Sequence, residues 1–107
     1  MYDNQRAYFR ILYPLEERPE LVVGEHTTEV VEVAEGGISF LVRPLGVVEV
    51  EQRLAGTLRL GARWTRQVEG EVVWVKAGRA AIKLDDPIPF KVILGEQLRL
   101  RGRYPWP

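Results

Sequence analysis

One stretch of the sequence decides the fold, Val30-Val31-Glu32-Val33-Ala34-Glu35-Gly36-Gly37-Ile38-Ser39-Phe40. Apolar and polar residues alternate on both sides of the Gly-Gly pair, which is typical of β-strands. The glycines stand where the chain must reverse its direction, so the two strands should pair antiparallel. We therefore predict strands over residues 27–34 and 38–42, joined by a turn at 35–37.

Strand patterns continue on both sides of this hairpin. They cover residues 7–13, 21–23, 47–50, 57–60, 63–75 and 80–84. Gly70, inside the longest of these, indicates a bulge or a sharp bend. Six or seven short strands joined by turns, without a long amphipathic helix, indicate an all-β fold, either an antiparallel barrel or a sandwich. We favour the β-barrel, because closing a small sheet removes its edge strands.

The C-terminal part of the chain has a less distinct pattern. The apolar positions of residues 90–100 fit either a last strand or a short helix. Residues 101–107 are rich in arginine, glycine and proline, and we expect an irregular tail there. No linker or internal repeat divides the 107 residues, so we predict one domain over 1–107.

Composition excludes several classes of function. The 15 basic and 15 acidic residues cancel, so the chain lacks the positive charge of a general DNA or RNA binder. The absence of cysteine and the single histidine argue against a disulfide framework and against a zinc site. There is no apolar signal region and no run long enough to span a membrane. We therefore expect a cytoplasmic protein without membrane insertion, metal or cofactor.

Arg6 and Arg10 form an Arg-x-x-x-Arg pair near the start of the chain. Arginine forks bind phosphate in a bidentate manner, stack on purine rings and hydrogen-bond guanine. In an N-terminal arm, over residues 1–10, the two side chains could close around a ligand. The alternative is a pair of solvated surface arginines.

Glu32 and Gly37 belong to the predicted hairpin beside this arm. A carboxylate at Glu32 can accept hydrogen bonds from the N1–H and N2–H groups of guanine; alternatively, Glu32 is an outward-facing strand residue between two valines. Gly36 and Gly37 permit positive φ and a close approach of the backbone, so their N–H groups could contact phosphate. A simple hairpin turn needs the same glycines.

Trp74 lies in the longest predicted strand and could stack on a base, or it could pack in the core. Asp85 and Asp86 precede a proline and are better explained by a strand-terminating turn than by acid–base catalysis. His26 has no Ser, Cys or Asp partner in a catalytic pattern. We therefore predict no catalytic residues and no enzymatic activity.

The sequence resembles the PilZ domain family, small bacterial receptors of cyclic di-GMP. Four segments carry the resemblance: Arg6-Ala7-Tyr8-Phe9-Arg10-Ile11, Val31 to Phe40, Gly70-Glu71-Val72-Val73-Trp74-Val75 and Arg79-Ala80-Ala81-Ile82-Lys83-Leu84. The resemblance implies a six-stranded antiparallel β-barrel, usually with a helix near its C-terminus. It also implies that the arm with Arg6 and Arg10 closes over the ligand.

The second motif of the family is Asp or Asn-x-Ser-x-x-Gly on the barrel surface. It aligns with Glu32, Ala34 and Gly37, so the carboxylate is one methylene longer and the serine hydroxyl is missing. Together with Trp74 these residues form the expected ligand site. Gln5 stands where many members carry a further arginine.

The resemblance therefore implies a cyclic di-GMP-binding effector module that transmits the level of this second messenger to a protein partner. We expect a monomer or a weak dimer. The alternative, favoured by Glu32, Ala34 and the tail with Trp106, is a ligand-independent adaptor in type IV pilus assembly or motility. A small nucleic-acid-binding barrel is a third alternative, against which the zero net charge argues.

Overall fold

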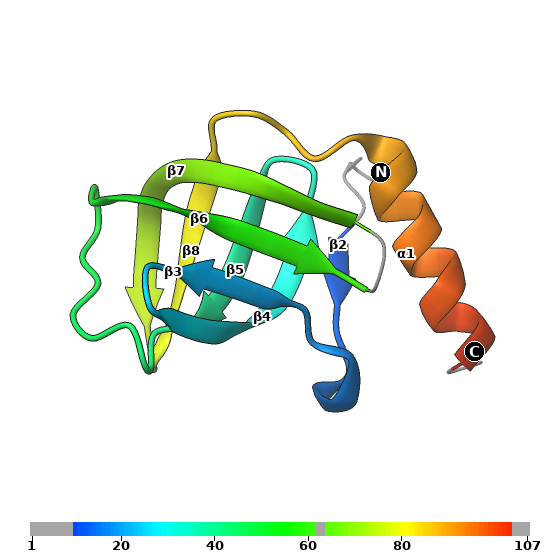
Figure 1. The fold of residues 1–107 in the computed structure, drawn as a ribbon, viewed down its shortest axis with the longest axis horizontal. Coiled ribbons are helices and arrows are strands. Elements are labelled where there is room, and N and C mark those ends of the chain that lie inside the picture. Colours follow the sequence, from blue (N-terminus) through cyan, green and yellow to red (C-terminus); the bar gives the residue numbers. More distant parts are fainter. Residues whose placement is uncertain (1–9, 62–63, 104–107) are drawn as a thin grey trace, which may run out of the picture.

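The computed structural model describes residues 10–61 and 64–103 (Figure 1). In chain order the elements are β2 (Arg10–Leu12), η1 (Leu15–Glu17), β3 (Glu20–Val23), β4 (His26–Ala34), β5 (Gly37–Leu41), β6 (Arg53–Leu60), β7 (Trp64–Lys76), β8 (Arg79–Leu84) and α1 (Phe90–Arg103).

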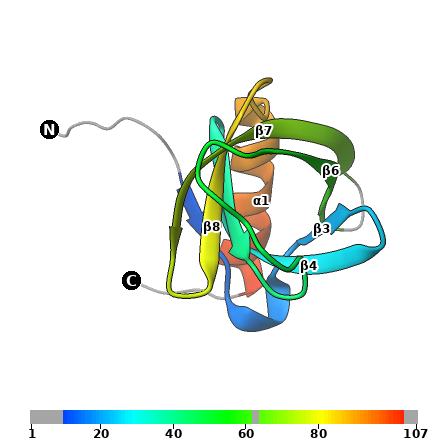
Figure 2. The same ribbon diagram turned by 90° about the vertical axis from the view of Figure 1, so that its left-hand side faces the viewer.

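The strands form an antiparallel barrel that closes on itself. The order in the sheet is β2-β4-β3-β6-β7-β8-β5, and an additional pairing of β4 with β5 completes a ring of six strands, β3 to β8. Strand β2 is an extra strand that pairs with the end of β4. Figures 1 and 2 show the strands curving round a common centre, with α1 lying across one end of the barrel. The predicted barrel and a C-terminal helix are therefore confirmed.

The core fills the barrel because alternate residues of each strand point inward. Its largest fully buried side chains come from several strands, from the connection between β8 and α1, and from α1: Phe40, Leu21, Leu58, Leu60, Ile82, Ile88, Ile93, Val30, Val33 and Val72. The helix contributes Ile93 and Leu100 to this core, so its inner face seals the end of the barrel against water.

Two predictions about the strands were wrong. Residues 47–50 are not a strand; they belong to the connection between β5 and β6. The next strand begins at Arg53 and continues through Gly56, where the sequence pattern had indicated a break. Gly56 is needed inside the strand because a Cβ there would lie 2.4 Å from the carbonyl oxygen of Val22 on β3.

Residues 90–103 form a helix, which decides between the two alternatives for 90–100. The helix extends through Arg103, so the expected irregular tail does not begin at residue 101. Residues 104–107, including Trp106, lie outside the described part of the chain. Arg10, placed in the expected arm, is the first residue of β2.

A polar cluster attaches α1 to the segment after β2. The hydroxyl of Tyr13 donates a buried hydrogen bond to Glu96 Oε1 (2.6 Å). Arg99 Nε donates to Glu96 Oε2 (3.0 Å), and Arg99 Nη1 donates to Glu17 Oε1 (3.1 Å). These contacts bring the helix, η1 and the end of β2 together, and they help to fix the strand that carries Arg10.

This cluster predicts a loss of stability at high pH. Burial, together with the neighbouring Glu96, raises the pKa of Tyr13 above its ordinary value of 10. Above pH ~10 the unfolded chain releases the Tyr13 proton while the folded protein retains it, so stability falls with rising pH by up to about 1.4 kcal/mol per pH unit. We expect Tyr13→Phe to make this fall shallower between pH 9 and 11, as measured by urea unfolding. Equal slopes for both proteins would contradict the assignment.

Candidate ligand-binding site

A cavity of about 370 Å³ lies on the outer face of the barrel, across β4, β5, β8 and β7. Small side chains form its floor: Ala34, Gly37, Ser39 and Ala81. Large or charged side chains surround them: Arg10, Glu32, Trp74 and Lys83. A floor of small side chains with a cationic and aromatic rim suits a planar, anionic ligand, because rings can stack on the tryptophan while the cations bind phosphate.

A β-bulge in β4 directs Glu32 into this cavity. Val30 lies opposite Phe40, and both are in the core, whereas Glu32 lies opposite Ser39 because the register shifts between Val30 and Glu32. Without the extra residue Glu32 would lie opposite Ile38, which points into the core. A shift of one residue moves a side chain to the other face of the sheet. The bulge therefore places this carboxylate outside the barrel.

A second bulge, in β7, places Trp74 outside the barrel. Val72 lies opposite Ile82, and Trp74 lies opposite Ala81 instead of the core residue Ala80. Trp74 is consequently 40% exposed at the cavity rim, and the alternative that it packs in the core is wrong. The bulge predicted at Gly70 lies instead between Val72 and Trp74.

Gly70 has a different role in β7. A Cβ at this position would lie 2.1 Å from the carbonyl oxygen of Lys83, so the glycine permits close approach of β8.

The sequence did contain a signal for the true bulges. Each falls on a Val-Val pair preceded by glutamate, Glu29-Val30-Val31 and Glu71-Val72-Val73, where the doubled valine interrupts the alternation of period two.

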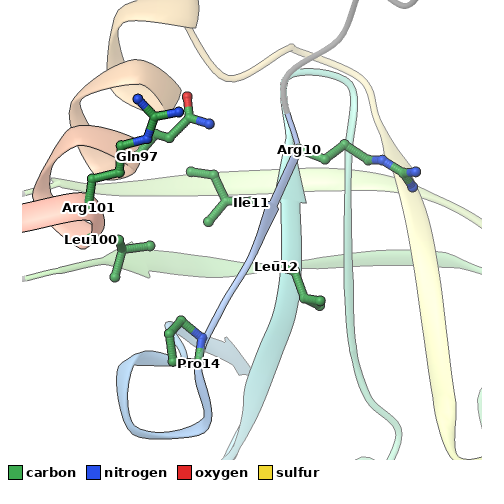
Figure 3. A pocket seen from close by; sticks show the side chains of 7 residues that line it. All are labelled: Arg10, Ile11, Leu12, Pro14, Gln97, Leu100 and Arg101. Atoms are coloured by element: carbon green, nitrogen blue, oxygen red, sulfur yellow. The ribbon is translucent and has the colours of Figure 1, made fainter. Parts of the chain in front are cut away.

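Arg10 reaches the cavity because β2 pairs with β4. The register sets Arg10 opposite Ala34 and Ile11 opposite Val33, so Ile11 points inward and Arg10 outward. Figure 3 shows Arg10 pointing away from α1, whereas Ile11 points toward it. The Nη1 atom of Arg10 lies 3.4 Å from Glu32 Oε2, and the arginine side chain is 69% exposed. An ion pair this exposed contributes only about 0–1 kcal/mol, so a ligand can displace it.

A second, smaller cavity of about 130 Å³ lies between β2 and α1 (Figure 3). Ile11, Leu12, Pro14 and Leu100 form much of its wall, and Gln97 and Arg101 lie on the helix side. The guanidinium of Arg10 points away from this space. We therefore take the larger cavity on the barrel face as the candidate site.

The two glycines of the hairpin turn differ in their roles. Neither has a positive φ, so the turn does not use the left-handed conformation that glycine permits. A Cβ at Gly37 would lie 2.8 Å from the carbonyl oxygen of Ile82, whereas a Cβ at Gly36 would meet no atom within 4 Å. The close approach predicted at Gly37 is therefore made by the backbone of β8.

Five of the six predicted site residues meet at this cavity. Arg10, Glu32, Ala34, Gly37 and Trp74 all line it, and Arg6 lies outside the described residues. Sequence reasoning missed Lys83, an exposed cation opposite Gly37 on β8. The sequence feature that could have identified Lys83 is the alternating segment Ala81-Ile82-Lys83, in which Lys83 takes an outward position. The rim thus carries two cations and one carboxylate.

No metal-binding cluster appears in the described residues. They contain no group of three or more His, Cys, Asp or Glu side chains that could hold a metal ion. Asp85 accepts a hydrogen bond from Arg53, and the carbonyl of Asp86 accepts one from Arg66 Nη2 (2.8 Å), as expected for a structural turn. Within residues 10–61 and 64–103, no helix is long and apolar enough to cross a membrane.

Comparison with known proteins gives one family. The family model described as PilZ domain matches residues 4–99. No curated protein matches the chain in sequence. The solved structures that share its fold include one from Legionella and one from Bacillus subtilis. An uncharacterized protein of Legionella has a TM-score of 0.63 at 14% identity, covering 90% of this chain and 97% of its own. The inhibitor of motility of Bacillus subtilis (MotI/DgrA) has a TM-score of 0.56 at 19% identity, covering 94% of this chain and 52% of its own.

Proposed function

The chain belongs to the PilZ domain family, and on this basis we propose that it binds cyclic di-GMP and transmits the level of this messenger to a protein partner. The family is one of binding and adaptor domains and not of enzymes. Cyclic di-GMP is a planar-ringed, doubly anionic ligand, so it needs cations for its phosphates and flat surfaces for its guanines. We place this activity in the cytoplasm, where the family typically acts.

The position of Arg10 is the observation that supports this proposal most strongly. Its guanidinium stands beside a floor of small side chains, and its ion pair with Glu32 is exposed. In the proposed complex the guanidinium leaves Glu32 and binds a phosphate or a guanine edge. Trp74, on the opposite side of the floor, offers a face for stacking.

The departures from the family motif weaken binding without abolishing it. A missing hydroxyl at Ala34 costs about 0.5–1.5 kcal/mol, the contribution of one neutral hydrogen bond. The charge-assisted contacts of Arg10 contribute about 1.5–3 kcal/mol, so they outweigh that loss. Glu32 is one quarter exposed at the cavity, and its carboxylate can accept the N–H groups of guanine once Arg10 has moved.

Isothermal titration of the purified protein with cyclic di-GMP tests the proposal. We expect measurable heat and saturation, together with partial quenching of the tryptophan fluorescence as a base stacks on Trp74. GMP serves as the control ligand, because it has one guanine and one phosphate and cannot bridge the site. Absence of heat at high micromolar cyclic di-GMP would reject the receptor function.

A second candidate is a ligand-independent adaptor in type IV pilus assembly or motility. Arg10 already has a carboxylate partner, and the three consecutive residues Val73, Trp74 and Val75 expose apolar surface at the end of β7. In this case a partner protein, once identified, should bind equally well to the wild type and to Arg10→Ala. Loss of partner binding in that variant would favour the receptor function instead.

A further inference from the structure

Ser39 is the polar residue of the cavity floor for which the fold supplies no partner. The residue is only 3% exposed, and it lines the cavity. Its Oγ atom is buried and makes no hydrogen bond with any described residue. Buried hydroxyl groups are nearly always paired, because an unpaired one loses its hydration without compensation. An orphan hydroxyl in a cavity floor therefore indicates a partner that binds there.

The register places this hydroxyl at the site and outside the core. Ile38 and Phe40, the neighbours of Ser39 along β5, both point into the barrel, so Ser39 lies on the outer face. It is flanked there by Glu32 of β4 and Ala81 of β8. The other buried hydroxyl groups of the described residues are satisfied inside the fold. Thr28 Oγ1 donates to the carbonyl oxygen of Leu41 (2.6 Å), and the Tyr13 hydroxyl donates to Glu96 Oε1 (2.6 Å).

We propose that the Ser39 hydroxyl is a ligand-binding group of this site and donates a hydrogen bond to a phosphate oxygen. This inference rests on the proposed function. Arg10 and Lys83 lie on the rim around the same floor, and their charges draw the phosphate toward it. Ser39 is the diagonal neighbour of Ala34 across the β4–β5 pair, about 7 Å away. The family motif has a serine at the position of Ala34 on β4. In this chain the hydroxyl of the site is that of Ser39, on the adjacent strand β5.

Access to this hydroxyl depends on the rim side chains. The Oγ atom lies beneath the surface in the ligand-free structure, so a ligand must first displace a side chain that covers the floor. The exposed side chains of Arg10 and Trp74 can move without disturbing the barrel, because neither is packed in the core. Ligand binding and exposure of the Ser39 hydroxyl therefore occur together.

Ser39→Ala tests the assignment, with Thr28→Val as the matched control. We expect Ser39→Ala to have an unchanged or higher Tm without ligand, and an affinity for cyclic di-GMP that is about 10-fold lower, as for the loss of one hydrogen bond to a charged oxygen. Thr28→Val should show the opposite result, a lower Tm and an unchanged Kd, because its hydroxyl is paired within the protein and does not line the cavity.

The outcomes separate this inference from the proposed function. If the wild type binds cyclic di-GMP and Ser39→Ala binds it equally well, the Ser39 assignment is overturned and the receptor function stands. A lower Tm of Ser39→Ala without ligand also overturns the assignment, because the hydroxyl must then have a partner within the protein. If the wild type gives no binding heat, both the receptor function and the Ser39 assignment fail.

Discussion

Replacing Arg10 by alanine is expected to weaken the binding of cyclic di-GMP by about 10- to 150-fold, the equivalent of 1.5–3 kcal/mol. The change removes a guanidinium that contributes two parallel N–H donors to a phosphate or to guanine. The stability of the protein should hardly change, since the ion pair of Arg10 with Glu32 is exposed. Titration calorimetry gives the affinity, and thermal unfolding gives the stability.

Arg59 provides a matched control for this experiment. Its Nη1 atom lies 3.4 Å from Glu20 Oε1, the same separation as in the pair of Arg10 with Glu32, and it is also exposed. Arg59 does not line the cavity, so Arg59→Ala should bind cyclic di-GMP as the wild type does. Arg10→Lys retains the charge without the planar fork, so its affinity for cyclic di-GMP should lie between those of Arg10→Ala and the wild type. Wild-type affinity in Arg10→Ala would exclude Arg10 from the site.

Gly37→Ala is expected to lower the free energy of unfolding by about 1–3 kcal/mol. The added Cβ would lie 2.8 Å from the carbonyl oxygen of Ile82, so β5 and β8 must move apart. These two strands form the middle of the cavity floor, and their separation would also distort the site. Urea unfolding followed by fluorescence measures the loss, and titration with cyclic di-GMP measures its effect on binding.

Gly36→Ala is the control for this substitution, one residue away in the same turn. Nothing lies within 4 Å of a Cβ at Gly36, and its φ is not positive, so alanine should fit there without strain. We expect its stability to stay within about 1 kcal/mol of the wild type, with a small gain from the stiffer unfolded chain. Equal stability of the two variants would contradict the role assigned to the contact with Ile82.

The candidate site was predictable in part. Arg10, Glu32, Ala34 and Gly37 were selected from the resemblance to the motifs of the family, and the structure brings them to one cavity together with Trp74. Their role in ligand binding stays a prediction. Lys83 and Ser39 were missed because they lie on β8 and in the second strand of the hairpin, where no motif marks them. Only the pairing of β5 with β4 and β8 makes them neighbours of the motif residues.

The sequence by itself determined most of the strands and the hairpin at residues 35–37, because alternation of period two and the position of glycine are local properties of the chain. Only the tertiary structure decided which face each site residue occupies. The bulges at Val31 and Val73 shift the register by one residue, and this shift moves Glu32 and Trp74 from the core face to the outside. Register depends on how a strand pairs with its partner, and the residue pattern of one strand alone does not determine that pairing.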